Sequence, residues 1–295
     1  MIDCLLEAEI PALIQGASGR TGRQHLRLMQ RYGTRIVGGV SARAELREIE
    51  GVPVFANCRE AVAATGARAS VLMVPALSVL AALTEAVEAG IELVVTVTEG
   101  VPVHDAMKAL GIARAHGATW IGASTPGIAI PGRLKLGFLP DVALAPGSLG
   151  MMSKSGTLSY EVGHRLVQRG LGQTLWVGVG GDLVKGTRFA DLVPLFARHA
   201  PTRGIVVIGE IGGTEEEELA EALAANRIAK PVFALLAGSH APEGVMMGHA
   251  GAMIYGNRGS FASKRAALEA AGAQVYTTMD DLVRGIASDP NLLEQ

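Results

Sequence analysis

The 295-residue chain has few cysteines, few aromatic residues and no excess of charge of either sign. Its two cysteines, Cys4 and Cys58, are too few for a disulfide framework and lack the spacing of metal ligands. With 26 Lys and Arg against 28 Asp and Glu, the formal charge is −2, and there is no basic excess of the kind that nucleic-acid binding requires. We therefore expect no metal site and no nucleic-acid partner.

Long hydrophobic runs are also scarce, although 49% of the residues are apolar. The uncharged stretch between Arg68 and Glu85 is interrupted by Pro75, whereas a membrane span needs about 20 predominantly apolar residues. The first residues carry no basic segment like that of a secretory signal. The apolar residues instead suit parallel strands covered by helices on both faces. We therefore expect a cytoplasmic protein with no membrane segment.

What the chain does contain is a regular alternation of short apolar segments, glycine-marked turns and helical stretches. This alternation predicts βαβ units and parallel sheets. The expected strands are Pro11–Gln15, Arg35–Val40, Val71–Val74, Leu93–Thr98, Thr119–Ile121, Leu149–Ser153, Leu175–Val179, Ile205–Ile208, Val232–Leu236 and Gln274–Tyr276. Closely spaced Pro-Gly pairs between residues 126 and 147 indicate a connection. The predicted α/β architecture is two doubly wound domains, at residues 1–128 and 148–295, joined by a linker at 129–147.

The first glycine turn, GASGRTG at residues 16–22, follows the first expected strand and opens a helix. Such a turn lets the backbone approach a phosphate, and the helix N-terminus supplies free N–H groups. A NAD site usually has a carboxylate at the end of the second strand, but here none occurs before Glu45. Arg43 and Arg47 instead favour a nucleotide with an extra phosphate, which both NADP and coenzyme A (CoA) carry.

Three segments of the second half together predict a phosphohistidine site. His249 lies among small residues, so a neutral ring nitrogen is accessible as a nucleophile; His240 lacks the spacing to form a zinc site with it. Glu210, at the end of an expected strand, can orient an imidazole. The segment Ser155–Thr157 provides hydroxyls and N–H groups for an anion at a helix N-terminus. Because no GxxxxGK[ST] segment occurs, we expect another polypeptide to bind the phosphoryl donor.

Six segments, in chain order, give the sequence a resemblance to the α subunit of succinyl-CoA synthetase, an ADP- or GDP-forming acid–thiol ligase. They are GASGRTG at 16–22, GVPVF at 51–55, TVTEG at 96–100, SKSGTLSYE at 153–161, GEIGGTEEEE at 209–218 and MGHAGA at 247–252. The resemblance implies an N-terminal Rossmann-like CoA-binding domain followed by a flavodoxin-like ligase domain. It also implies a partner β subunit with an ATP-grasp fold, in an αβ or α2β2 assembly, that binds ATP or GTP with Mg2+.

The resemblance assigns roles by position. His249 would be the phosphorylated residue and Glu210 its hydrogen-bond partner, while Tyr160 would lie near the acid substrate. The residues that would hold the phosphate are Ser155, Gly156 and Thr157, and those that would bind CoA are Ser18, Gly19, Arg20, Thr21, Val97, Thr98 and Glu99. The phosphoryl group would pass from the nucleotide to His249 and then to a carboxylate, and CoA would attack the acyl phosphate.

Two departures from the family pattern limit this assignment. The family's TPGKGG loop is replaced by a segment that has Ala44 at the lysine position, and we expect Arg43 to supply the cation instead. The family's NCPG segment, near the acid, begins here with Ser124 and Thr125. This change argues against succinate and leaves malate, citrate, a sulfonated or sulfinated short acid or another small carboxylate as the substrate.

Two other functions stay open from the sequence. An NADP-dependent oxidoreductase would explain the first turn and Arg43 but not SKSGTLSYE or MGHAGA. A non-catalytic CoA-sensing protein would have no need of His249, Glu210 and Ser155.

Overall fold

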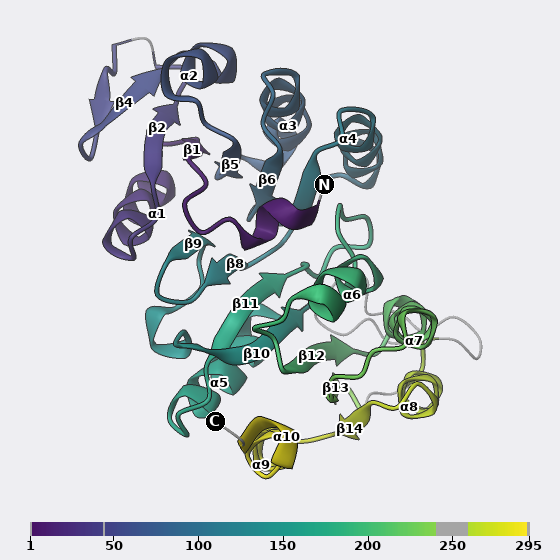
Figure 1. Cartoon of the computed structure of the whole chain (residues 1–295). Helices are drawn as coiled ribbons and strands as arrows, with labels where there is room; N and C mark the ends of the chain where they lie inside the picture. Colours follow the sequence, from purple (N-terminus) through teal and green to yellow (C-terminus); the bar gives the residue numbers. More distant parts are fainter. Residues whose placement is uncertain (1, 44, 240–258, 294–295) are drawn as a thin grey trace. The chain divides into compact units, whose positions relative to one another are not determined.

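The computed structural model describes residues 2–43, 45–239 and 259–293. The chain forms two compact units, Met1–Leu139 with Val184–Gly186, and Pro140–Leu183 with Thr187–Gln295. Each contains a mainly parallel sheet with helices packed against it (Figure 1). This confirms the predicted α/β class, while the domain limits given above stay a prediction. Within the described residues, no helix is both long enough and apolar enough to cross a membrane.

The sheet of the first unit has the strand order β3-β4-β2-β1-β5-β6-β7 and is parallel except for the β3–β4 pair. The strands are β1 (Ala12–Gln15), β2 (Ile36–Val40), β3 (Glu48–Ile49), β4 (Val52–Phe55), β5 (Ala69–Leu72), β6 (Leu93–Thr96) and β7 (Thr119–Gly122). The strand order reverses at β1, where Gln15 is in register with Val40 of β2 and Leu72 of β5. In open α/β sheets, ligands bind beyond the carboxyl ends of the strands at this point.

The helices of the first unit are α1 (Arg20–Arg31), α2 (Cys58–Thr65), α3 (Val79–Glu88) and α4 (Val103–Ala115). Short 3-10 turns occur at Ile2–Leu6 and Ala76–Ser78. Two antiparallel strands, β8 (Gly127–Ile130) and β9 (Leu134–Gly137), form a hairpin within the expected connection. The hairpin is tied to the residues after α1, because the Thr34 hydroxyl donates to the Lys135 carbonyl at 2.8 Å and accepts the Lys135 N–H at 2.9 Å.

In the second unit, five parallel strands lie in the order β14-β13-β12-β10-β11. They are β10 (Pro146–Ser153), β11 (Gln173–Gly178), β12 (Gly204–Glu210), β13 (Val232–Ala237) and β14 (Gln274–Tyr276). A 3-10 turn at Asp141–Ala143 precedes them, and the helices are α5 (Gly156–Val167), α6 (Phe189–Arg198), α7 (Glu215–Asn226), α8 (Phe261–Ala270), α9 (Met279–Ala287) and α10 (Pro290–Leu293). The core is built on the fully buried side chains of Trp176, Phe189, Phe196 and Phe233.

Candidate active site

The glycine turn after β1 is tighter than the motif alone indicates, because α1 already begins at Arg20. Gly16 has φ +80°, and its carbonyl accepts the N–H of Gly19 at 3.0 Å. A Cβ atom at Gly22 would collide with the Gly16 carbonyl oxygen. Gly19 is the N-cap and offers no side chain, so no side-chain cap covers the first N–H groups of α1. Backbone donors at a helix N-terminus are suited to binding a phosphate.

A cavity of about 540 Å³ opens beside this turn and contains most of the residues predicted to bind CoA. Its lining comes from the start of α1 and from the segments that follow β5 and β6, together with Phe138. The predicted residues in the lining are Gly19, Arg20, Thr21, Val97, Thr98 and Glu99. The predicted set is therefore gathered at the carboxyl edge of the sheet, where the fold favours ligand binding.

Ser18 lines a second cavity, of about 340 Å³, together with Ser41 and Ala42 at the end of β2. The Ser41 hydroxyl donates to the Ser18 hydroxyl oxygen at 2.8 Å, and the Arg43 N–H donates to the Ser41 hydroxyl oxygen at 3.2 Å. These bonds fix the backbone of Arg43 beside the cavity, while its side chain is exposed. A cation there is available to a ligand phosphate.

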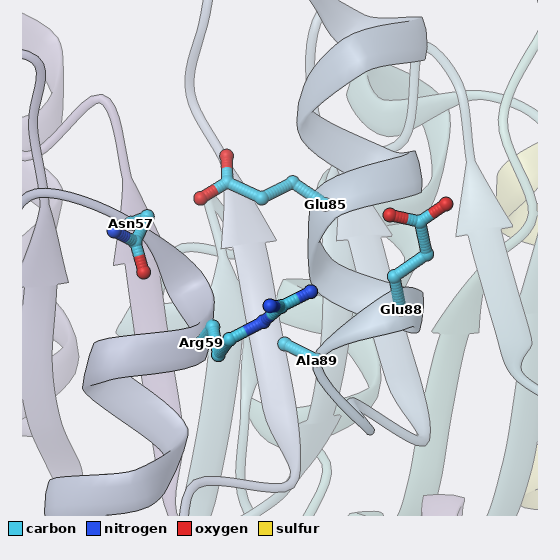
Figure 2. A pocket seen from close by; sticks show the side chains of 5 residues that line it. All are labelled: Asn57, Arg59, Glu85, Glu88 and Ala89. Carbon is cyan, nitrogen blue, oxygen red and sulfur yellow. The ribbon is translucent and has the colours of Figure 1, made fainter.

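Figure 2 shows a third cavity, of about 310 Å³, between α2 and α3. Arg59 extends from α2 toward α3, which carries Glu85 and Glu88. The Glu85 carboxylate accepts the Cys58 N–H at 2.6 Å and so caps α2. Two carboxylates against one guanidinium suit a phosphate less well than the N-terminus of α1 does. We therefore leave this cavity out of the candidate CoA site.

Ser124 and Thr125, predicted to lie near the acid substrate, follow β7 and adjoin the CoA-site residues. Ser124 has φ 55°, and its N–H donates to the Thr98 carbonyl at 2.9 Å. The Thr125 side chain is buried, and its hydroxyl oxygen accepts the Gly127 N–H at 2.9 Å. Tyr160, predicted for the same role, belongs to α5 in the second unit, where burial raises the pKa of its phenol.

The predicted phosphate-binding residues lie where β10 ends and α5 begins. Ser155 is the N-cap of α5, and its hydroxyl oxygen accepts the Leu158 N–H at 3.3 Å. Gly156 and Thr157 form the start of the helix. The Ser153 hydroxyl donates to the Ser155 carbonyl at 2.7 Å and accepts the Ser155 N–H at 3.1 Å, which closes the loop. An anion here would meet the positive end of the α5 dipole.

Glu210 is the last residue of β12, at the same sheet edge as the phosphate-binding loop. β10 and β12 are adjacent, with Ser153 in register with Ile208, and the Lys154 N–H donates to the Ile208 carbonyl at 3.0 Å. Glu210 is also in register with Ala237 of β13. Glu210 and the phosphate-binding loop therefore follow adjacent parallel strands at one edge of the sheet, as expected.

His249 and the whole MGHAGA segment, like His240, lie outside the described residues. The described residues on either side of that segment adjoin the Glu210 turn. On one side β13 ends at Ala237, paired with Glu210. On the other side the Gly259 carbonyl accepts the Gly212 N–H at 2.7 Å. Ala237 and Gly259, which precede and follow the His249 segment in the chain, are thus both bonded next to the end of β12.

Sequence reasoning missed a buried charged cluster at this edge, formed by Lys154, Glu216 and Lys264. Their side chains are 7%, 0% and 0% exposed, and Glu216 is ion-paired to both lysines. The sequence held one signal for it, four consecutive glutamates at Glu215–Glu218, but a charged first turn is typical of a solvated helix start.

Comparison with known protein families gives the class of protein to which the two halves of the chain are similar. Residues 7–100 match the CoA-binding domain family, and residues 152–274 match the CoA-ligase family. The chain is 44% identical over 273 residues, 92% of its length, to succinate–CoA ligase [ADP-forming] subunit alpha of Aquifex aeolicus, of which 89% is covered. It is 42% identical over 283 residues, 96% of its length, to subunit alpha 2 of the Archaeoglobus fulgidus ligase, of which 98% is covered. The chain belongs to the family of succinate–CoA ligase α subunits, which confirms the resemblance and favours a ligase over an oxidoreductase or a sensor.

Solved structures with the same fold belong to longer chains. ATP citrate lyase from Methanothrix soehngenii, solved with citrate and coenzyme A, superposes with a TM-score of 0.84 at 23% identity, over 94% of this chain and 49% of that one. The dinucleotide-forming acetyl-coenzyme A synthetase 1 of Ca. Korarchaeum cryptofilum superposes with a TM-score of 0.77 at 20% identity, over 96% and 61%. This chain thus spans about half the length of the citrate lyase chain. At these identities the likeness supports the fold alone.

Proposed function

We propose that this chain is the α subunit of a nucleoside-diphosphate-forming carboxylate–CoA ligase that acts through phosphorylated His249. The observation that carries the proposal is that Glu210 and the helix N-terminus at Ser155 follow adjacent strands at one sheet edge, where Ala237 and Gly259, described residues before and after the His249 segment in the chain, are also bonded. A histidine nucleophile, a carboxylate to orient it and donors for a phosphate are the groups that phosphoryl transfer through histidine requires.

CoA would bind in the first unit. Its phosphates would lie at the N-terminus of α1 near Ser18 and Thr21, and the rest of the molecule would follow the cavity lined by Val97–Glu99. The extra phosphate of CoA would be held by Arg43, whose backbone is bonded beside the second cavity. We assign CoA binding to residues 1–128, the linker to 129–147 and the ligase chemistry to 148–295.

The reaction has three steps. A ring nitrogen of His249 attacks the γ-phosphorus of the nucleotide, so that an N–P bond forms and the nucleoside diphosphate leaves. Glu210 accepts a hydrogen bond from the other ring nitrogen and so selects the reactive tautomer. The substrate carboxylate then attacks the phosphorus, which breaks the N–P bond and gives an acyl phosphate. Finally the CoA sulfur, having lost its proton, attacks the acyl carbon and expels phosphate, giving the acyl-CoA.

The partner would be a β subunit of the ATP-grasp class that binds ATP or GTP with Mg2+, in an αβ or α2β2 assembly. The relatives are named as α subunits, and the sequence contains no P-loop motif. The acid would be a short carboxylate bound near Tyr160, Ser124 and Thr125. We propose a cytoplasmic enzyme, in line with the lack of a membrane-spanning helix among the described residues.

The test is to label the complex of this chain and its partner with γ-32P-ATP or γ-32P-GTP. We expect an acid-labile label on this chain, released when CoA and the correct acid are added together. The variant His249→Asn should take up no label, whereas His104→Asn, which alters an exposed histidine of α4, should label normally. A wild-type chain that takes up no label, or a His249→Asn variant that labels as well as wild type, would refute the proposal.

A further inference from the structure

The buried cluster centred on Glu216 carries two ammonium groups on one carboxylate. Lys154 Nζ lies 2.9 Å from Glu216 Oε1 and 3.1 Å from Oε2, and Lys264 Nζ is ion-paired to Oε2. Burial alone would raise the pKa of Glu216, but Lys154 and Lys264 outweigh burial and hold the pKa at about 2. The carboxylate is therefore ionised at any physiological pH.

This cluster holds the backbone on both sides of the Glu210 Cα atom. Glu216 Oε1 accepts the N–H of Glu210 at 3.1 Å. Lys264 Nζ donates to the carbonyl of Glu210 at 2.7 Å and to that of Gly212 at 2.5 Å. Because both peptide groups of Glu210 are bonded to the same ion pair, the direction in which its side chain leaves the backbone is fixed by Glu216 and Lys264.

The cluster and its neighbour in α7 also reach the phosphate-binding loop and Gly259. Lys154 is the residue between Ser153 and Ser155, so its ion pair joins that loop to α7. Next to Glu216 in α7, Glu217 accepts the Gly259 N–H at 2.8 Å. Lys154 of the phosphate-binding loop, Glu210 and Gly259 are thus all bonded to the first turn of α7.

The packing around the pair leaves little room for adjustment. A Cβ atom at Gly209 would lie 2.7 Å from Glu216 Oε1, and one at Gly259 would lie 2.6 Å from the Gly213 carbonyl oxygen. An apolar pair of similar volume could fill the same space, and buried ion pairs add little net stability over such a replacement. An apolar pair could not, however, hold the peptide groups of Glu210. This difference indicates that the ion pair of Glu216 and Lys264 serves to position Glu210.

We propose that Lys264 and Glu216 are positioning residues for phosphoryl transfer: they hold both peptide groups of Glu210 and so direct its carboxylate. The inference rests on the proposed function. Neither residue touches the reacting atoms, so each acts only through Glu210. Displacing a catalytic group by about 1 Å can cost on the order of 100-fold in rate.

The experiment is a double-mutant cycle in the assembled complex, with the rate of His249 labelling as the readout. Lys264→Met keeps the length of the side chain but removes its charge and its donors. We expect labelling to slow by roughly 10- to 100-fold. Combined with Glu210→Gln, it should add little, because the misplaced group is already disabled. The matched control is Arg265→Met, which removes the next cation of α8 from an exposed ion pair with Glu269 and should leave the rate unchanged.

A second variant distinguishes the proposed role from a folding defect of Lys264→Met. Lys264→Met with Glu216→Gln removes both charges of the pair and should assemble with the partner, bind CoA normally and still label slowly. If both variants fail to assemble, the pair serves folding and the inference is overturned.

The remaining outcomes separate the inference from the proposed function. If wild type labels and Glu210→Gln slows labelling, but Lys264→Met labels at the wild-type rate, the inference fails and the function stands. If the losses of Lys264→Met and Glu210→Gln multiply, Lys264 does not act through Glu210, and the inference again fails. If wild type takes up no label, the proposed function itself has failed.

Discussion

Replacing Glu216 by glutamine should destabilise the second unit strongly at neutral pH and much less in acid. The amide keeps the size of the side chain but removes the carboxylate paired with Lys264 and leaves Lys154 with only Glu215, 3.7 Å away. Native Glu216 has a pKa of about 2, against 4.5 for the ordinary group. At about 1.4 kcal/mol per pKa unit, this difference is worth about 3 kcal/mol at pH 7.

The sign of the pH dependence follows from the lowered pKa. The stabilisation is fully present above pH 4.5, the value in the unfolded chain, and is lost as the pH falls toward about 2. At pH 3 the unfolded chain has already bound the proton that the native carboxylate resists, so less than half of the effect remains. The cost of Glu216→Gln should therefore shrink from about 3 kcal/mol at pH 7 to about 1 kcal/mol at pH 3.

The two tryptophans allow the second unit to be followed by itself. Trp120 belongs to the first unit and Trp176 to the second, and both are buried. In a Trp120→Phe background, urea unfolding monitored by fluorescence reports on Trp176 alone. The matched control is Glu221→Gln, which makes the same change at an exposed position of α7. A loss below about 1 kcal/mol at pH 7, an equal loss at pH 3, or a control that loses as much would refute the reasoning.

Two further predictions concern the CoA site. Arg43→Ala should weaken CoA binding about 10-fold or more, as expected for a lost charged hydrogen bond. Calorimetry should show no such loss with 3′-dephospho-CoA or for Arg59→Ala, which alters the cavity between α2 and α3. An unchanged CoA affinity would exclude the role given to Arg43. Gly22→Ala should abolish measurable CoA binding, because the new Cβ atom would collide with the Gly16 carbonyl and shift the turn, whereas Gly111→Ala, which meets open space in α4, should bind CoA normally. Normal binding by Gly22→Ala would show that the turn does not hold the phosphates.

The alternation of strands and helices could be predicted because it depends on local patterns. Each strand expected from an apolar run is present within a few residues of its predicted limits. The edge pair β3–β4 was missed because Glu48–Ile49 is too short to show a period. The hairpin of β8 and β9 lies where Pro-Gly pairs indicated only a connection, and Gly127 and Gly137, paired at its open end, each pack against the backbone of the facing strand.

The candidate site likewise has local features that the sequence predicted and a long-range feature that it did not. The glycine turn and the N-cap at Ser155 are local features, so the sequence located them directly. The burial of Glu216 depends on Lys154 and Lys264, which lie 62 and 48 residues away in the chain. No pattern in a single sequence marks such a pairing, and a run of glutamates at a helix start is normally solvated.

The chain passes between the two units three times, since residues 184–186 return to the first unit after the second has begun. Gly186 packs tightly against the first unit in this short segment. Its N–H donates to the Gly122 carbonyl at 2.8 Å, and a Cβ atom at Gly186 would collide with the backbone of Trp120. A gene cut near residue 139 would therefore encode a first unit that lacks this piece. The two units are thus expected to have been inherited as one block, with fusion to other domains confined to its ends.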